Sequence, residues 1–532
     1  MARVHLQEEL QRTGERVSVE TKYGQITGGR ALNGAKVFLE VPYALPPQRF
    51  QDPEPLPDGY RYESKEYIFE SSYAAQPRND GQAAGLPFED KVGLGKPTEN
   101  PLFVNVVTPP EASPQSKYPV KVYIHGGFLQ FGSPHGLSSQ AQYVAVARKQ
   151  VWVNVGYRLS AFGFLASDEP RVDGNFGFKD QWLALLWVRE HIASFGGMFS
   201  IYWSDPDDIQ VSGLSAGAHS VHQLLHHASR LPEGVPAPFR SAVLQSNAIV
   251  IAPKTPAELR PQFHALCRAL KLDPSADDIL TKLRDEKLVP WSAITDVIET
   301  DAIGLQYGTF RGCFDGTWLS EEPMGWQRSG EFARALKAKG VRSIVMGDLI
   351  DEWFLYSIAH PITSMRDIEV NLERYYQEDM VKRVLTLYKI LPHDAPEQDF
   401  RKLFGEVLSE GQVHVPVRLL ARDLDNAGFP FLRYEIRWTP EQVRPLGYVT
   451  HGTDRSIWAL REPVLQPAQV ETAQAWLDAV DSEVKKLEEE GKNQHSVLEV
   501  LALKEDKTIG WIEDTRWDSM MRLSQVLPGE GD

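Results

Sequence analysis

Residues 209–225, IQVSGLSAGAHSVHQLL, decide the fold of this 532-residue chain. They pass from a strand-like IQV segment through the pentapeptide GLSAG at 213–217 to a helix-like segment. Such a Gly-x-Ser-x-Gly turn between a strand and a helix lifts a serine hydroxyl above the end of a sheet, at a helix N-terminus. Gly213 and Gly217 leave room for the tight turn. The pattern makes Ser215 the candidate nucleophile, although such a short pattern also arises by chance.

A second glycine-rich loop, HGGF at residues 125–128, also ends a buried strand and precedes the serine turn. An oxyanion loop has this place in chain order. Acyl transfer puts negative charge on a carbonyl oxygen, and backbone N–H groups held at that point lower the barrier. We expect Gly127, Phe128 and Ala216 to supply these donors. The alternative is a plain glycine turn after a strand.

The flanking sequence alternates buried strands with helices. From about residue 118, the apolar runs VKVYIHGG, VWVNVGYR, IQVSGLS and SAVLQSN are each followed by a glycine-rich loop or a helical stretch. This alternation is typical of a mostly parallel sheet with crossover helices on both faces. Residues 16–44 instead alternate apolar and polar positions, which predicts a small antiparallel part at the N-terminus.

Three further segments have helical patterns and few strand signals. Residues 254–330 and 361–425 are rich in charge, and we expect them to be helical insertions outside the sheet that form a cap. The tail 466–532 begins with a charged helix and ends in PGEGD, which we expect to be frayed.

Composition excludes several classes of protein. The chain is 42% hydrophobic and 24% charged, which is ordinary for a globular enzyme. A net charge of −16 argues against a nucleic-acid partner, because phosphate binding needs clustered Lys and Arg. A polar N-terminus and the lack of 18 successive apolar residues argue against a signal peptide and stable membrane insertion. With only Cys267 and Cys313, we expect a cytoplasmic protein.

Over residues 16–460 the chain resembles the type-B carboxylesterases, the family of carboxylesterases, cholinesterases and fungal lipases, and most of all its cytosolic fungal members. The resemblance implies the α/β-hydrolase fold. Its firmest segments are FLEVPYALPPQRF at 38–50, NPLFVNVVTP at 100–109, VYIHGGFLQFGS at 122–133, NVGYRLSAFGFLAS at 154–167 and GNFGFKDQWLALLWVREHIASFGG at 174–197.

The resemblance also implies the partners of Ser215. The acid of the family follows a Gly-x-x-x-Asp-Glu pattern, which here is SIVMGDLIDEWF and indicates Glu352; the histidine motif is similar to LGYVTHGTDRSIW and indicates His451. The order serine, acid, histidine is the one this fold requires. Because these groups meet only if one fold spans them, we predict that residues 1–532 form a single catalytic domain.

Departures from the family carry information. AAQP at 74–77 and Pro101 stand where secreted members have cysteine, so the first family disulfide is absent and a cytoplasmic location is favoured. Leu214 replaces a frequent glutamate, which predicts an apolar pocket floor and neutral carboxylic esters as substrates. The resemblance assigns Ser246 as a partner of the acid, and Arg158 and Asp180 as a structural ion pair.

The predicted activity is hydrolysis of a small-molecule ester through an acyl-enzyme, with no cofactor and no metal. We expect pocket residues among Leu129, Leu214 and Trp353, with Phe128, Phe354 and Trp326 as further aromatics, although each could be a core residue. A lipase, a dedicated lactone, carbamate or secondary-metabolite hydrolase, and a non-catalytic binding protein remain alternatives, and the oligomeric state stays open. A zinc site at His219, His222, His226 and His227 is disfavoured, because no glutamate stands between them as in HExxH.

Overall fold

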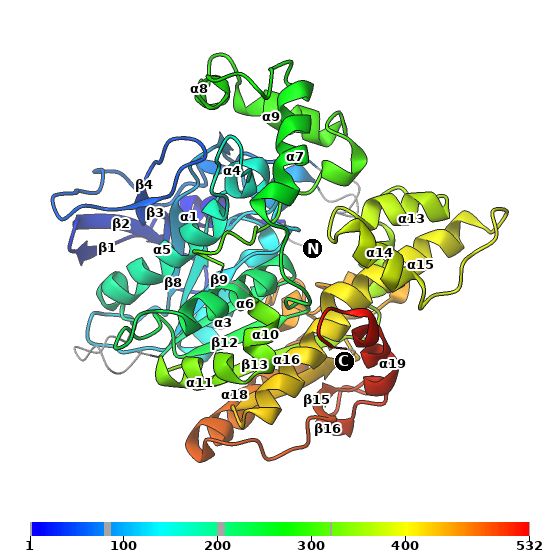
Figure 1. Cartoon of the computed structure of the whole chain (residues 1–532). Helices are drawn as coiled ribbons and strands as arrows, with labels where there is room; N and C mark the ends of the chain where they lie inside the picture. Colours follow the sequence, from blue (N-terminus) through cyan, green and yellow to red (C-terminus); the bar gives the residue numbers. More distant parts are fainter. Residues whose placement is uncertain (1–2, 79–86, 199–207, 320–321, 531–532) are drawn as a thin grey trace.

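A computed structural model describes residues 3–78, 87–198, 208–319 and 322–530. In these residues a twelve-stranded sheet crosses the molecule (Figure 1). In spatial order its strands are β1 (Arg16–Thr21), β2 (Gly24–Arg30), β3 (Lys36–Pro42), β8 (Phe103–Thr108), β10 (Val151–Val155), β9 (Val120–Ile124), β11 (Ile209–Leu214), β12 (Ser241–Gln245), β13 (Ser343–Leu349), β14 (Phe431–Ile436), β15 (Glu499–Leu503) and β16 (Ile509–Glu513). Two small ladders pair β4 (Ala44–Leu45) with β5 (Glu54–Pro55) and β6 (Ser72–Ala74) with β7 (Lys96–Thr98).

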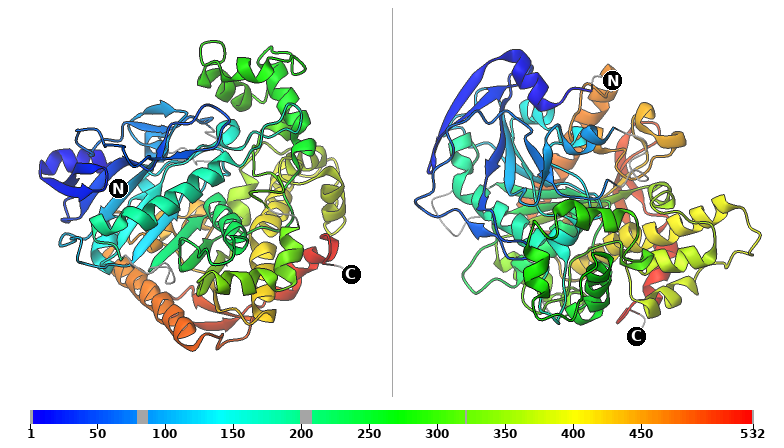
Figure 2. Two further views of the ribbon diagram at one scale, coloured as in Figure 1. Left: turned by 60° about the vertical axis from the view of Figure 1, so that its left-hand side comes forward. Right: turned by 90° about the horizontal axis from the view of Figure 1, so that it is seen from above.

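The centre of the sheet is parallel and its edges are antiparallel. Strands β10, β9, β11, β12, β13, β14 and β15 pair in parallel. Strands β1, β2, β3 and β8 form an antiparallel edge, and β16 pairs antiparallel with β15 at the opposite edge. The predicted parallel sheet and the N-terminal antiparallel part are both confirmed. Figure 2 shows the two edges, blue and red, far apart.

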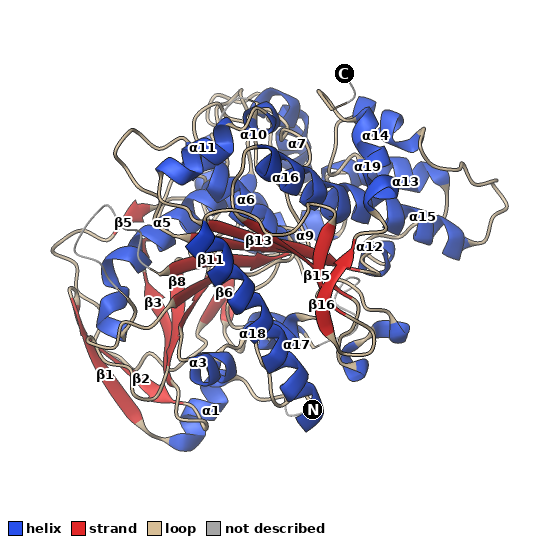
Figure 3. Ribbon diagram, turned by 90° about the horizontal axis from the view of Figure 1, so that it is seen from below, coloured by secondary structure: helices blue, strands red, loops and turns tan. Residues whose placement is uncertain are grey.

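Helices cover both faces of the sheet (Figure 3). One face packs on α3 (Gln142–Arg148), α17 (Arg455–Trp458) and α18 (Pro467–Glu490). The other packs on α5 (Phe176–His191), α6 (Ala216–Ser229), α11 (Glu331–Ala338) and α16 (Val415–Asn426). Parallel strands buried on both faces need apolar side chains in both directions, which explains the apolar runs of the sequence.

Two helical lobes project beyond the sheet, drawn green and yellow in Figure 1. The first contains α7 (Pro256–Ala269), α8 (Ile279–Arg284) and α9 (Trp291–Glu299), and the second α12 (Trp353–Ser357), α13 (Met365–Leu372), α14 (Glu378–Leu385) and α15 (Glu397–Ser409). The insertions that we expected at 254–330 and 361–425 extend too far toward the C-terminus. Helix α10 (Pro323–Arg328), at the end of the first, packs on α11 and α16. Helix α16, at the end of the second, packs on β13 and β14 as a crossover helix.

The C-terminal tail departs most from expectation. Its helix α18 buries Trp476 completely against the sheet, and β15 and β16, which we did not predict, complete the far edge. The Glu530 carboxylate binds Arg328 and Arg422, each at 2.6 Å. The expectation of a frayed end is therefore wrong for residues 528–530, because two ion pairs hold them; residues 531 and 532 lie outside the described residues.

The remaining helices are short. They are α1 (Leu6–Thr13), α2 (Phe88–Val92), α4 (Ser160–Phe164), α19 (Trp517–Met521), the 3-10 turns Leu137–Ser139, Ile192–Phe195, Leu305–Tyr307, Glu441–Val443, Pro445–Gly447 and Arg522–Val526, and a π-helical turn at Glu410–His414. Among the described residues, no helix combines the length and apolarity that crossing a membrane requires. Cys267 and Cys313 are both free and buried.

Candidate active site

Ser215 occupies a strained turn between β11 and α6. Its φ of 61° and ψ of −125° lie in a region that residues with side chains rarely adopt, at a cost of about 1–3 kcal/mol. Its backbone N–H donates to the Gln245 carbonyl at 2.8 Å, and its own carbonyl accepts from the His219 N–H at 3.0 Å. The adjacent strand and the first helical turn therefore hold the serine at the carboxyl end of β11.

The two glycines of the pentapeptide are required by close backbone approach. A Cβ atom at Gly213 would lie 2.3 Å from the carbonyl carbon of Gly217. One at Gly217 would lie 2.1 Å from the carbonyl oxygen of Ile124. No side chain fits at either place, so the turn packs α6 directly against the end of β9.

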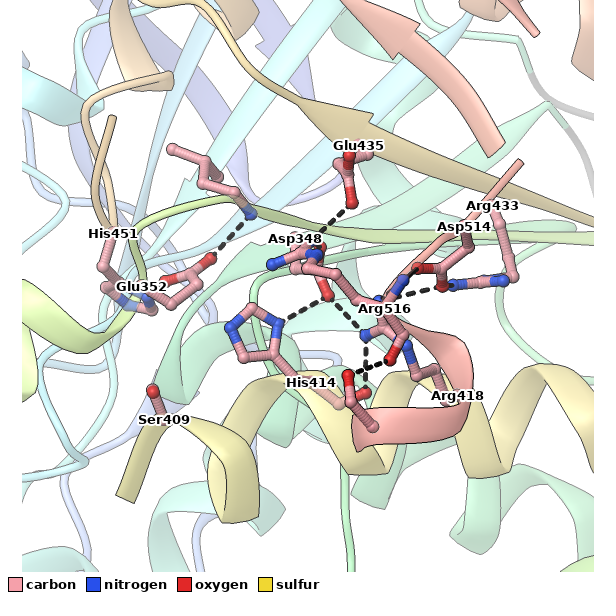
Figure 4. A network of polar contacts seen from close by, with 12 residues as sticks. Asp348, Glu352, Ser409, His414, Arg418, Arg433, Glu435, His451, Asp514 and Arg516 are labelled. Atoms are coloured by element: carbon pink, nitrogen blue, oxygen red, sulfur yellow. Dashed lines mark hydrogen bonds and ion pairs between the residues drawn. The ribbon is translucent and has the colours of Figure 1, made fainter. Parts of the chain in front are cut away.

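The Glu352 and His451 side chains lie next to each other (Figure 4). Glu352 follows β13 at the start of α12, and His451 precedes α17. The Nδ1 atom of His451 lies 2.6 Å from Glu352 Oε2, and the Leu349 N–H donates to Oε1 at 3.0 Å. Because Glu352 is fully buried and bound at both oxygens, it holds the imidazole in one orientation.

The other ring nitrogen of His451, Nε2, has no partner among described residues. Its Nε2 atom is buried and makes no hydrogen bond with any described residue. A Cβ atom at Gly452 would lie 3.7 Å from Leu214 Cδ2, so the neighbours of the histidine and of Ser215 are in van der Waals range. The structure thus brings the loop of His451 to the serine turn.

The glycine loop after β9 lies directly on Ser215. A Cβ atom at Gly126 would lie 2.9 Å from the Ser215 Cβ atom, and Gly127 has a φ of 117° with the Phe131 carbonyl oxygen 1.9 Å from its Cβ position. Among described residues, the backbone N–H groups of Gly127, Phe128 and Ala216 find no acceptor. Three unused donors therefore stand beside the serine.

The Phe128 side chain leaves this loop toward the second lobe. Its φ is 56°, and its ring lies 5.9 Å from Tyr356 and 6.2 Å from Tyr375. Tyr356 in turn lies 5.4 Å from the His451 ring. A cluster of aromatic rings thus connects the glycine loop to the histidine.

The structure bears differently on the predictions for Ser246 and for the Arg158–Asp180 ion pair. Ser246 is buried with a φ of 56°, but its Oγ has no hydrogen-bond partner among described residues, so the expected contact with Glu352 is absent. The ion pair of Arg158 with Asp180 is confirmed: Nη2 and Nε bind the two carboxylate oxygens at 2.6 and 2.8 Å. It fixes the loop after β10 to α5.

The expected pocket residues pack in different surroundings. Leu129 is buried in the main core, and Leu214 packs partly buried beside Gly452. The Trp353 ring packs on Tyr448, with 5.1 Å between the ring centroids. Phe354 stacks on the same Tyr448 ring, and Trp326 donates its indole N–H to Ser229 at 3.2 Å.

Two hollows next to the site were not anticipated. The Arg311 cavity has a volume of about 70 Å³ and contains His219, Arg311 and Tyr375 in its wall. The Phe128 cavity has a volume of about 410 Å³ and contains Phe128 and Tyr375 in its wall. No sequence pattern indicated either one, because their walls combine loops that are distant in sequence.

The four histidines of α6 are packed in the core. Both His222 nitrogens are bound, Nδ1 by the Ile249 N–H at 2.9 Å and Nε2 by Gln327 at 3.0 Å. His226 stacks near Phe332, His227 stacks on Trp318, and burial lowers the pKa of both rings. Their surroundings offer hydrogen bonds and ring contacts, not a shared metal position, and no metal-binding group of three ligands occurs among described residues.

A buried ion-pair network lies beside the acid (Figure 4). Asp348, on β13, binds His414 at 2.8 Å, Arg418 at 2.9 Å and Arg516 at 3.0 Å. Arg418 also binds Asp514 at 2.8 Å. These cations hold the pKa of Asp348 well below its usual range although burial opposes them. The network ties the strand that precedes Glu352 to α16 and to the C-terminal tail.

Asp454 is a second carboxyl group near the histidine. It is fully buried, and Oδ2 accepts the indole N–H of Trp458 at 2.9 Å. Burial, followed by the charge of Glu352, raises its pKa to about 6. Its place three residues after His451 was visible in sequence, but nothing there distinguished it from other acids.

Comparison with known proteins identifies the family. Residues 15–480 match the model of the carboxylesterase family. The chain is 29% identical over 521 residues to an uncharacterized esterase/lipase of Schizosaccharomyces pombe, covering 92% of each chain. It is 30% identical over 454 residues to a carboxylic ester hydrolase of Gibberella moniliformis, covering 79% of this chain and 78% of the relative.

A third relative lies outside the fungi. A para-nitrobenzyl esterase of Bacillus subtilis is 28% identical over 376 residues, which cover 70% of each chain. Because the family match spans most of the chain, and the parallel sheet with helices on both faces agrees with it, the chain belongs to the carboxylesterase family and has the α/β-hydrolase fold.

Proposed function

We propose that this carboxylic ester hydrolase works through an acyl-enzyme on Ser215. His451 Nε2 takes the proton of the Ser215 hydroxyl during attack on the ester carbonyl and then protonates the leaving alcohol. Glu352 keeps Nδ1 protonated and stabilises the imidazolium. Water then attacks the acyl-enzyme with the same assistance.

The oxyanion is stabilised by the N–H groups of Gly127, Phe128 and Ala216. Each removed donor of this type typically costs about 10²–10³ in kcat. The observation that carries the proposal is the serine on its strained turn with the Gly126–Gly127 backbone against its Cβ atom. The Nε2 atom of His451, which has no hydrogen-bond partner among described residues, supports it, as do the names of the three relatives reported above, an esterase/lipase, a carboxylic ester hydrolase and a para-nitrobenzyl esterase.

The test is the variant Ser215→Ala. We expect hydrolysis of p-nitrophenyl butyrate to fall by a factor on the order of 10³ or more, because nucleophile and base act as one unit. A fluorophosphonate probe should label the wild-type protein and not the variant. Retained hydrolysis in the variant would refute Ser215 as the nucleophile. A wild-type protein that neither hydrolyses the ester nor takes the label would favour a non-catalytic binding protein.

Esterase and lipase share this chemistry and differ in the pocket. An acyl series from acetate to palmitate, measured below and above the solubility limit, separates them. We propose an esterase of small-molecule esters, acting as a single domain, and the free thiols of Cys267 and Cys313 support the proposed cytoplasmic location.

A further inference from the structure

The wall of the Arg311 cavity carries a guanidinium without a counter-ion. Arg311 Nη2 donates to Gln412 Oε1 at 3.3 Å, and the guanidinium lies over the Tyr375 ring at 5.3 Å. Within the described part of the chain, no carboxylate reaches salt-bridge distance, 4.0 Å, of Arg311. Arg311 is one of the residues that line the cavity.

Most other enclosed arginines of this protein are paired with acids. Arg158 binds Asp180, and Arg418 binds both Asp348 and Asp514. Placing a charge in a low-dielectric surrounding without a partner is costly, and proteins normally supply one. Arg455, which donates to the Ser138 carbonyl and lies over the Tyr123 ring, is one exception. Arg311 is another, and unlike Arg455 it lines the Arg311 cavity.

A second cation adds to the charge of the same wall. Lys254 donates to the Glu373 carbonyl at 2.9 Å and forms no ion pair with a described residue. Burial lowers the pKa of Lys254, the charges of Glu258 and Glu373 raise it, and the positive charge of Arg311 lowers it. The cavity wall thus carries three cations, Lys254, Arg311 and Arg374, and one carboxylate, Glu258.

The acids around the cavity are engaged elsewhere. Glu258 caps the first turn of α7, where Oε2 accepts from the Thr255 N–H at 2.7 Å and its hydroxyl at 2.8 Å. Asp301 binds Arg374, the third cation of the wall, at 3.1 Å. Neither acid neutralises Arg311.

The cavity adjoins the proposed reaction centre. His219, in its wall, lies one helical turn after Ser215 on α6. Tyr375, which carries the Arg311 guanidinium on its face, lies 6.2 Å from the ring of Phe128 in the glycine loop. The cavity wall therefore begins one helical turn from Ser215.

We propose that the Arg311 cavity binds a carboxylate that the ester substrate carries at the end remote from the scissile bond. The proposal rests on the proposed function and differs from our expectation of neutral esters, which considered only Leu214. A guanidinium binds a carboxylate through two parallel hydrogen bonds, and Lys254 adds a point charge. The preferred substrates are half-esters of dicarboxylic acids, and hydrolysis itself proceeds as on any ester.

The experiment compares matched esters that differ only in this charge. The wild-type protein, Arg311→Gln, Arg311→Lys and the control Arg366→Gln are assayed on the monomethyl and dimethyl esters of adipic and suberic acid. The exposed Arg366 side chain pairs with Glu369 on α13 and lines neither cavity. We expect the wild type to prefer the monoester at least tenfold in kcat/KM. Arg311→Gln should lose this preference with less than a twofold change on the diester, Arg311→Lys should keep part of it, and the control should keep all of it.

Equal losses on both esters in Arg311→Gln, or a wild-type preference for the diester, would overturn the proposal. A binding measurement tests the cavity independently of ester hydrolysis. Adipate should raise the melting temperature of Ser215→Ala and not that of Ser215→Ala/Arg311→Gln; shifts of equal size contradict the proposal. If the wild type hydrolyses no ester, the proposed function fails, and the adipate shift still decides the cavity.

Discussion

At the scale of single residues, Gly126 controls access to the serine although it takes no part in the proposed reaction. A methyl group there would lie 2.6 Å from the Leu214 carbonyl oxygen and 2.9 Å from the Ser215 Cβ atom. Both contacts are shorter than packed carbon atoms tolerate, so the loop or the serine must move. The donors of Gly127 and Phe128 would then leave the developing oxyanion.

We therefore predict that Gly126→Ala lowers kcat on p-nitrophenyl butyrate by about 10² or more, the typical cost of a lost oxyanion donor. Gly59→Ala is the matched control, because nothing lies within 4 Å of its Cβ position. Steady-state kinetics, with melting temperatures to check folding, measure the effect. Normal kcat in Gly126→Ala would mean that the loop is not the oxyanion site.

The raised pKa of Asp454 predicts that the stability of the protein depends on pH. Its pKa of about 6 in the folded protein exceeds the value near 3.9 of an unfolded aspartate, so the folded state binds this proton more tightly. The free energy of unfolding contributed by this group is therefore highest below pH 4 and falls as the pH rises to 6, by up to about 3 kcal/mol.

Asp454→Asn removes the titration and keeps an oxygen for the Trp458 indole. Relative to the wild type, the variant should gain up to about 3 kcal/mol of stability between pH 4 and pH 7. Urea unfolding at pH 4, 5, 6 and 7 measures the difference. A difference between the two proteins that stays constant with pH would show that Asp454 ionises normally.

At the scale of secondary-structure elements, Arg418 joins α16 on one side of the sheet to β13 and the tail. It is fully buried between Asp348 and Asp514. Removing it leaves two buried carboxylates whose low pKa values depend on its charge. Arg418→Met should lower the free energy of unfolding by about 3–5 kcal/mol, the usual cost of breaking a buried pair.

Arg401→Met on α15 is the control for this prediction. Arg401 and Glu397 are each half exposed, and such pairs contribute about 0.3–0.5 kcal/mol. Urea midpoints of both variants give the comparison. Similar small losses in the two variants would mean that the network around Asp348 adds little to stability.

The elements that sequence predicted well are those whose pattern depends on local burial. The strands around Ser215 are buried on both faces and therefore continuously apolar, and α5 shows its helical period. Strands β15 and β16 escaped prediction because they follow the conspicuous charged helix α18 in sequence, and because β16, at the sheet edge, is only partly buried. The end of the second insertion was misplaced because α16 continues the charged pattern of α15 while packing on the sheet.

At the scale of the whole molecule, sequence was informative about the reaction centre and silent about the cavities. Ser215, Glu352 and His451 each stand in a motif of neighbouring residues, so the family resemblance named them. Arg311 stands in FRGCF, where no neighbour indicates its role. Its environment arises only when Lys254, Tyr375 and Gln412 meet from three distant segments.

The placement of the lobes has a consequence for how this protein could diversify. Ser215 and Glu352 directly follow β11 and β13, whereas Arg311 belongs to the excursion between β12 and β13, and Tyr375 to that between β13 and β14. The groups proposed to cleave the ester therefore stand at the strand ends, and those proposed to select it stand further along the excursions. Recombination that exchanges the distal parts of the excursions would change the proposed substrate range and leave Ser215 and Glu352 in place.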